Sequence, residues 1–108
     1  MTLQYAKQRI VKDISVEDKR VQVTGYIKTQ IDENIVLLND KTGEIKINVG
    51  SLEDFVFKEG DLINIIGDVE IKITGEKLIN ADIVQDMNKL NFDYYMKLYQ
   101  LKKEMDLD

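Results

Sequence analysis

The sequence contains neither cysteine nor histidine. Without cysteine the chain has no disulfide framework and no thiolate metal site, and without histidine it lacks the commonest transition-metal ligand and general base. Acidic side chains are numerous, but they are dispersed among loops with no recognised spacing for a divalent cation. The scattered acids include Asp32, Glu33, Asp40, Asp82 and Asp86. We therefore expect no enzymatic activity, no metal and no cofactor.

Long apolar runs are also missing. A membrane-spanning helix needs roughly 20 apolar residues, and no run approaches that length. The N-terminus lacks the apolar core of a signal peptide. We expect a soluble intracellular protein, in the cytoplasm, nucleoid or nucleus, with no membrane contact.

Charge is unevenly distributed along the chain, whose formal net charge is −5. Residues 1–30 carry six basic and three acidic groups (+3), residues 31–90 carry six and thirteen (−7), and residues 91–108 carry three and four (−1), which sum to −5. The total argues against tight non-specific binding of polyanions. The excess of basic groups in the first 30 residues is compatible with one basic face, and scattered solvated charge is the alternative.

The clearest secondary-structure pattern is in NIVLLNDKTGEIKINVG, from Asn34 to Gly50. An apolar run at residues 35–38 leads into turn residues at 39–43, after which apolar and polar residues alternate strictly from Glu44 to Val49. This pattern predicts a β-hairpin with one apolar face.

Three further stretches alternate in the same way: Arg20–Gln30, Asp61–Lys72 and Leu78–Met87. In the first two a glycine, Gly25 or Gly67, falls in mid-strand on the apolar face, where the missing side chain permits a bend or bulge. The residues expected to point inward are Val21, Val23, Ile27, Ile63, Ile65, Val69, Ile71, Ile79, Ala81 and Ile83. The count is five main strands.

Three other segments complete the predicted organisation. Arg9–Ile14 is expected to be a short strand or extended arm. Ser51–Gly60 is predicted to be a short helix, capped by Ser51 with Asp54 three residues on, and ended by Gly60 in the left-handed conformation. From Asn91, a plausible N-cap, the apolar period changes from 2 to 3.6, which predicts a terminal helix over about residues 91–106.

The 108 residues suffice for one domain, covering 1–108, with a barrel over about residues 9–87. Five strands, two of them bent, with a helix between the third and fourth strands, favour an all-β OB fold, a five-stranded Greek-key barrel followed by a C-terminal helix. An SH3-like barrel is the main rival, but it does not ordinarily place a capped helical turn at residues 51–60.

Several segments resemble the small OB-fold subunits of replication protein A, of the archaeal and eukaryotic middle and small subunit type. The segments are RIVKDI followed by VQVTGYI, the D-x-T-G-x-I turn in NDKTGEIKINV, FVFKEGDLINIIGDV, and the helix that begins NFDYYMKLY, together covering about residues 9–105. Similar D-x-T-G turns occur in anticodon-binding OB domains and in small subunits of telomere-capping complexes.

The resemblance implies a subunit of a heteromeric single-stranded DNA-binding complex in DNA replication and repair, with other OB-fold subunits as its partners. In such folds cations follow the nucleic-acid backbone and aromatic side chains stack on bases. The side chains expected at the groove are Tyr26, Lys28, Lys46, Asn48, Lys72 and Lys77.

Binding by this chain alone is expected to be weak. The third main strand offers lysine and asparagine where an aromatic is common, and Asp32 and Glu33 in the first loop repel phosphate. Two alternatives stay open: Tyr26 packs against a neighbouring element, and Lys28 and Lys46 are ordinary solvated charges.

The terminal helix carries two apolar stripes. The first consists of Tyr94, Leu98, Leu101 and Met105, and the second of Phe92, Tyr95, Met96 and Tyr99. Because one barrel cannot easily bury both, one stripe is predicted to meet a partner chain. The residues expected at that subunit interface are Phe92, Tyr94, Tyr95, Leu98, Tyr99, Leu101 and Met105. A deep groove in the chain's own barrel, exposed tyrosines and a homodimer are the alternatives.

The main functional hypothesis is therefore an assembly subunit with at most weak single-stranded DNA contact. A stand-alone or homodimeric single-stranded nucleic-acid-binding protein and a small subunit of a telomere-capping-like complex are the alternatives.

Overall fold

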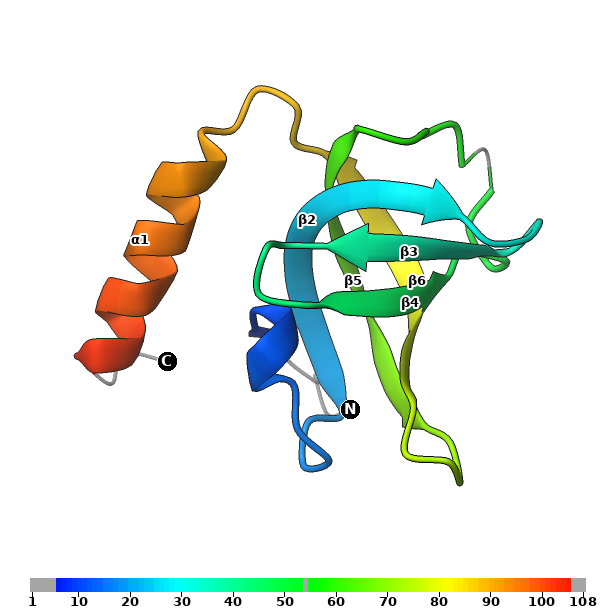
Figure 1. Ribbon diagram of the computed structural model, residues 1–108, viewed down its shortest axis with the longest axis horizontal. Coiled ribbons are helices and arrows are strands. Elements are labelled where there is room, and N and C mark those ends of the chain that lie inside the picture. Colours follow the sequence, from blue (N-terminus) through cyan, green and yellow to red (C-terminus); the bar gives the residue numbers. More distant parts are fainter. Residues whose placement is uncertain (1–5, 54, 106–108) are drawn as a thin grey trace, which may run out of the picture.

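A computed structural model describes residues 6–53 and 55–105. The chain forms a barrel with one helix beside it (Figure 1). In chain order the elements are β1 (Lys7–Gln8), η1, a 3-10 helix (Val11–Asp13), β2 (Arg20–Gln30), β3 (Ile35–Asn39), β4 (Glu44–Asn48), β5 (Leu62–Ile71), β6 (Lys77–Asp86) and α1 (Phe92–Glu104).

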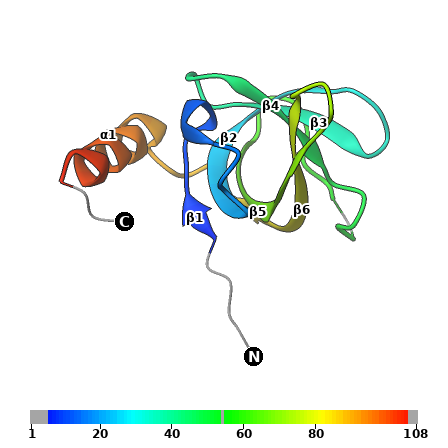
Figure 2. The ribbon, with the colours of Figure 1, turned by 90° about the horizontal axis from the view of Figure 1, so that it is seen from below.

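The sheet closes on itself. Its strand order is β1-β2-β3-β4-β6-β5, and an additional pairing of β2 with β5 joins the two ends. Only β1 with β2 and β4 with β6 run parallel among the described pairs. Strands β2 to β6 are thus the five barrel strands, and β1 is a two-residue addition beside β2 (Figure 2). The predicted OB fold with a C-terminal helix is confirmed.

Strand β2 bends sharply and belongs to both sides of the barrel (Figure 1). From Arg20 to Tyr26 it pairs with β5, and from Tyr26 onward it pairs with β3. Gly25 lies at this change of partner, where an added Cβ would come within 3.0 Å of the Asn39 carbonyl oxygen. The missing side chain therefore permits the two strands to approach at the bend.

The second mid-strand glycine marks a β-bulge, and the bulge corrects one prediction. Gly67 pairs with Ala81 while Ile66 pairs with Ile83, so Asp82 is the extra residue on β6. The extra residue inverts the alternation beyond it. Ile83 consequently points outward and is 43% exposed, contrary to the sequence prediction.

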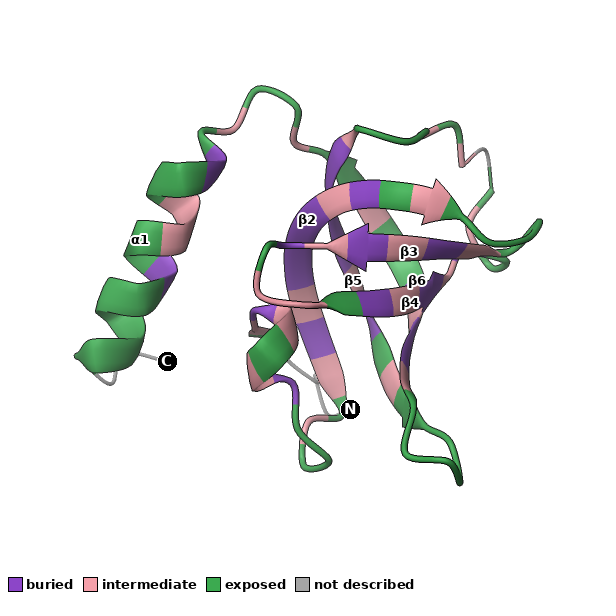
Figure 3. Ribbon diagram, in the orientation of Figure 1, coloured by how far each residue is buried: buried purple, intermediate pink, exposed green. Residues whose placement is uncertain are grey.

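The core fills the barrel with the remaining inward residues of all five strands (Figure 3). Ile71 is another exception among the inward predictions, because it ends β5 in the hairpin arm that extends beyond the barrel, where it is 38% exposed. The fully enclosed side chains include Val21, Val23, Leu38, Ile47, Ile63, Ile65 and Ile79.

The helix predicted at residues 51–60 is wrong for the residues that the structure describes there. Leu52, Phe55 and Phe57 are partly buried against the core, whereas Val56 is exposed. That period of two belongs to an extended segment, which buries alternate side chains. Gly60 does adopt the predicted left-handed conformation, with φ of +91°, and Asp54 lies outside the described residues.

The strand predicted as one possibility at residues 9–14 is a 3-10 turn instead. Asp40, which is fully buried, accepts hydrogen bonds from the Val11 amide (2.7 Å), the Thr42 amide (2.9 Å) and the Thr42 hydroxyl (2.6 Å). The D-x-T-G turn between β3 and β4 therefore holds η1 against the barrel.

Helix α1 begins where the sequence predicts. The Asn91 side chain accepts a hydrogen bond from the Tyr94 amide at 3.0 Å and caps the first turn. Among the described residues, no helix combines the length and the apolar character needed to cross a membrane.

Candidate nucleic-acid groove and subunit interface

The outward face of β3 and β4, beside the turn between β5 and β6, is where the sequence predicts the groove. On this face Leu37 lies opposite Lys46, and Ile35 lies opposite Asn48. All four side chains are half-buried. The face is thus aliphatic and polar, and it carries no aromatic platform on these two strands.

Three of the four lysines predicted for the groove make ion pairs within the chain. Lys28 contacts Glu44, while the Nζ atoms of Lys46 and Lys72 lie 3.0 Å and 3.6 Å from the Glu76 carboxylate. Hydrogen bonds from Lys28 and Lys46 lower the pKa values of Glu44 and Glu76, respectively. Both carboxylates therefore stay ionised at neutral pH and compete with any phosphate for the lysines.

The other predicted groove residues also have contacts inside the chain. Tyr26 meets Phe92 edge to face, with ring centroids 5.2 Å apart. The Asn48 side chain accepts a hydrogen bond from the Gly50 amide at 2.8 Å, and Lys77 donates to the Ile14 carbonyl. The geometry of Tyr26 matches the alternative that it packs against a neighbouring element.

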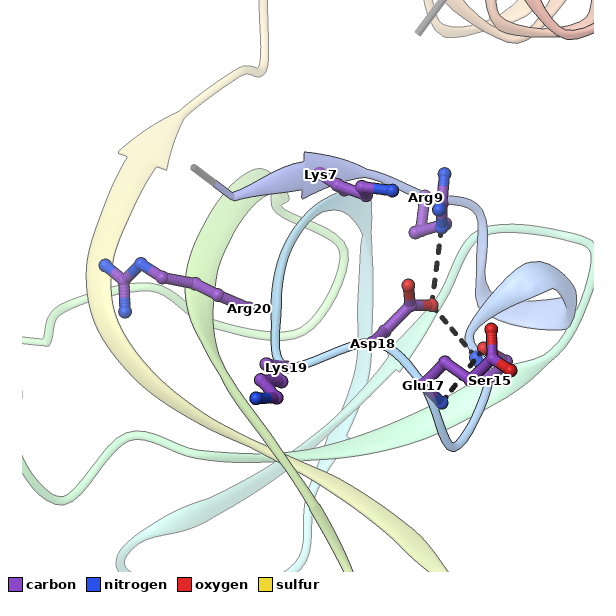
Figure 4. Close-up of a pocket in the computed structure, with 7 residues that line it drawn as sticks. All are labelled: Lys7, Arg9, Ser15, Glu17, Asp18, Lys19 and Arg20. Carbon is purple, nitrogen blue, oxygen red and sulfur yellow. Dashed lines mark hydrogen bonds and ion pairs between the residues drawn. The ribbon is translucent and has the colours of Figure 1, made fainter. Parts of the chain in front are cut away.

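A pocket of about 510 Å³ lies between the start of β2 and the N-terminal segment (Figure 4). Arg9 lies 3.3 Å from Asp18, and Arg20 binds Asp82 at 2.8 Å and Asp68 at 3.2 Å. The lining residues are Lys7, Arg9, Ser15, Glu17, Asp18, Lys19 and Arg20. The lining has four basic residues and two acidic ones. Arg9 and Arg20 are paired with carboxylates, those of Arg20 lying outside the lining.

The inner stripe of α1 packs against its own chain. Phe92 and Tyr99 are buried, and the Phe92 ring stacks on Tyr95 at 6.1 Å. The Tyr99 hydroxyl donates a hydrogen bond of 2.9 Å to Asp13, which also accepts one of 2.9 Å from Lys103. Phe92 and Tyr99, two of the residues predicted at a subunit interface, are thus occupied within the chain.

Opposing influences set the pKa values at this contact. Burial raises the pKa of Asp13, but hydrogen bonds from Lys103 and Tyr99 outweigh burial, so the net pKa lies below the ordinary value. Burial and the hydrogen bond to Asp13 raise the pKa of Tyr99 to about 12. Asp13 is therefore a carboxylate and Tyr99 a neutral phenol near pH 7, the states that this hydrogen bond requires.

The outer stripe of α1 is open to solvent (Figure 3). Its members are spaced by four, three and four residues, which places them on one side of the helix. The exposed fractions are 61% for Tyr94, 39% for Leu98, 50% for Leu101 and 59% for Met105. We call these four residues the apolar seam. Tyr95 belongs to the inner stripe, and its buried hydroxyl has no hydrogen-bond partner among the described residues.

Sequence reasoning missed Glu44, Glu76 and Asp13. Each is a charged residue whose partner comes from another element, and the sequence alone gives no register between elements. In the part of the chain that the structure describes, no three acidic side chains gather as a metal site.

Residues 5–106 match the protein family described as a telomere-capping, CST complex subunit, Ten1. The chain belongs to this Ten1 family. The match covers both the barrel and α1. The family corresponds to the alternative of a small subunit of a telomere-capping-like complex, and it does not support the more specific replication protein A assignment. The telomere-capping and replication protein A assignments both describe an OB-fold subunit of a larger complex. That coarser prediction is confirmed.

Solved structures share the fold of this Ten1 family member. The crystal structure of the S. pombe Stn1–Ten1 complex matches with a TM-score of 0.76 and 15% identity, over 97% of this chain and 96% of that chain. Ten1 from S. pombe matches with a TM-score of 0.76 and 16% identity, over 93% and 99%. The hypothetical protein ygiW from E. coli matches with a TM-score of 0.61 and 17% identity, over 79% and 99%. No curated protein sequence matches the chain.

Proposed function

We propose that this chain is a non-enzymatic assembly subunit of a nuclear telomere-capping complex, and that α1 docks another OB-fold subunit through the apolar seam. One observation carries the proposal. The inner stripe of the helix is already packed on the chain itself, yet four large apolar side chains stay exposed on the other side. A helix with two apolar sides is normally enclosed by two neighbours.

The seam has the composition of a protein interface. Tyrosine and methionine are enriched at such sites, and a seam spaced by four and three residues suits packing against another helix. Burying a large apolar side chain contributes about 1.5–3 kcal/mol. Four such side chains offset part of the entropy cost of association. A helix of the partner is the occupant that this spacing fits best.

The solved complex of S. pombe supports a heteromeric arrangement, because it is a complex of Stn1 with Ten1. A second copy of this chain is the alternative occupant, since the same seam is self-complementary in principle.

The nucleic-acid contribution of this chain is secondary in the proposal. A phosphate group contacts Lys28, Lys46 or Lys72 only by displacing the carboxylate that pairs with that lysine. The carboxylate is Glu44 for Lys28 and Glu76 for the other two. Tyr26 is engaged by Phe92. The chain therefore contributes weak backbone contacts to a single strand that other subunits hold.

Coexpression with a Stn1-type OB-fold subunit tests this function. We expect the two chains to copurify in a single peak whose mass, measured by light scattering, equals one copy of each. The chain expressed alone supplies the control for self-association. A chain that stays monomeric after coexpression would contradict the proposal, and a homodimer that excludes the second subunit would replace it.

A further inference from the structure

Helix α1 is attached to the rest of the chain at two places. At its N-terminal end, Phe92 contacts Tyr26, and the Lys41 ammonium group lies 5.7 Å from the Phe92 ring centroid. Towards its C-terminal end, Tyr99 and Lys103 both donate hydrogen bonds to one carboxylate, that of Asp13. The first attachment is mainly aromatic, with an added ion pair of 3.9 Å between Lys41 and Asp93. The second is polar and centres on a single residue.

Asp13 is itself held in place. It ends η1, and the Val11 amide of that short helix donates to the buried carboxylate of Asp40 at 2.7 Å. The Lys12 amide donates to the Thr42 hydroxyl at 3.3 Å. A continuous series of hydrogen bonds therefore runs from the turn between β3 and β4, through η1, to the last turns of α1.

We propose that Asp13 is a positioning residue that fixes the C-terminal half of α1 against η1 and so sets the direction in which the apolar seam meets its partner. This inference rests on the proposed function for the identity of the partner. Three of the four seam residues lie at or beyond the middle of the helix: Leu98 is its central residue, Leu101 lies in its C-terminal half, and Met105 is its C-cap. Without the Asp13 carboxylate, α1 pivots about its aromatic attachment at Phe92.

Positioning matters because a helix that is already ordered loses less entropy when a partner binds. The fixed orientation also keeps the seam turned away from the barrel, on the side opposite Tyr99. We therefore expect removal of the Asp13 carboxylate to weaken partner binding about tenfold, which corresponds to ~1.4 kcal/mol.

The first test measures the orientation of α1 in the isolated chain. Because the sequence has no cysteine, Gln30→Cys and Gln100→Cys give two unique sites for spin labels, one at the end of β2 and one on α1. Double electron–electron resonance is expected to show a narrow distance distribution in the parent chain and a broad one in Asp13→Ala. Glu104→Ala is the control, since Glu104 is an exposed acid of the same helix that makes no ion pair among the described residues. An unchanged distribution in Asp13→Ala would overturn the proposal.

A second pair of variants tests the role of Asp13 even if Asp13→Ala fails to fold. Lys103→Gln replaces the charged donor to Asp13 by a shorter, neutral one, whereas Lys102→Gln removes the same charge from a neighbouring residue that has no ion pair among the described residues. We expect a broader distribution for Lys103→Gln than for Lys102→Gln. Equal distributions in these two variants would contradict the role given to Asp13.

The second test measures affinity for the coexpressed OB-fold subunit by titration calorimetry. Asp13→Ala is expected to bind about tenfold more weakly than the parent, and Glu104→Ala equally well. A broad distance distribution with unchanged affinity would show that helix orientation does not govern docking and would overturn the proposal. If the parent chain binds no such subunit, the proposed function fails, while the distance measurement still decides whether Asp13 positions the helix.

Discussion

Asp40 shows how one polar residue organises this fold. Its carboxylate is fully buried and accepts three hydrogen bonds, two from Thr42 and one from Val11. A hydrogen bond to a charged group contributes about 1.5–3 kcal/mol, and a buried charge without such partners is strongly destabilising. The same residue therefore shapes the turn and fastens η1, on which Asp13 depends.

The sequence predicts only half of that role. The D-x-T-G spacing indicates that Asp40 and Gly43 belong to a turn, because that is a local pattern. The bond to Val11 crosses 29 residues of sequence, and no local pattern reports it. No local pattern reports the pairing of Lys46 with Glu76 either. Because of that pairing, Lys46 is not a free cation in the predicted groove.

Tyr99 supplies a prediction for alkaline pH. Its folded-state pKa of about 12 lies above the unfolded value of about 10, so the folded chain retains the phenolic proton longer than the unfolded chain. The resulting stabilisation is complete below about pH 10 and is lost as the pH rises through about 12.

Ultraviolet titration of tyrosinate checks this expectation. One of the chain's five tyrosines is expected to ionise near pH 12, and Tyr99→Phe is expected to remove that late transition alone. Urea unfolding at the same pH values is expected to show an extra loss of stability that Tyr99→Phe lacks. Ionisation of Tyr99 near pH 10, the ordinary value for a tyrosine, would contradict its buried hydrogen bond.

At the scale of elements, the barrel strands are predictable because a half-buried strand alternates in sequence. Two of the predictions that fail have specific causes. Residues 51–60 carry helix-capping signals, but Phe55 and Phe57 gain more by packing alternately on the core. Ile83 follows a bulge at Asp82, and an alternation pattern does not reveal where a residue has been inserted.

The face formed by β3 and β4 gives a prediction at this scale. Glu76 engages both Lys46 and Lys72, so Glu76→Gln releases two cations for phosphate. We expect Glu76→Gln to bind a single-stranded oligonucleotide severalfold more tightly than the parent at low salt, with a steeper salt dependence. Fluorescence anisotropy measures both quantities.

Glu104→Gln is the matched control, because it removes the same charge at the far end of α1. Equal affinities for Glu76→Gln and Glu104→Gln would show that net charge alone governs binding. In that case the β3–β4 face is not the nucleic-acid surface.

The molecule as a whole consists of a barrel with one helix beside it. The 3.6-residue period predicts both stripes of α1, and the structure confirms that they lie on opposite sides, one buried and one exposed. The sequence does not tell which stripe faces the barrel, because both are apolar. That choice depends on the Phe92–Tyr26 contact and on the acceptor at Asp13, which are tertiary features.

The apolar seam is the central claim, and one measurement tests it most directly. Leu98→Glu combined with Leu101→Glu places two charges in the seam while leaving the inner stripe intact. Lys97→Glu combined with Lys102→Glu adds two acidic side chains beside the seam and controls for charge. In copurification with a Stn1-type OB-fold subunit, we expect the leucine variant to lose the partner and the lysine variant to retain it, with both variants folded by circular dichroism. Retention of the partner by the leucine variant would contradict the assignment of the seam as the docking surface.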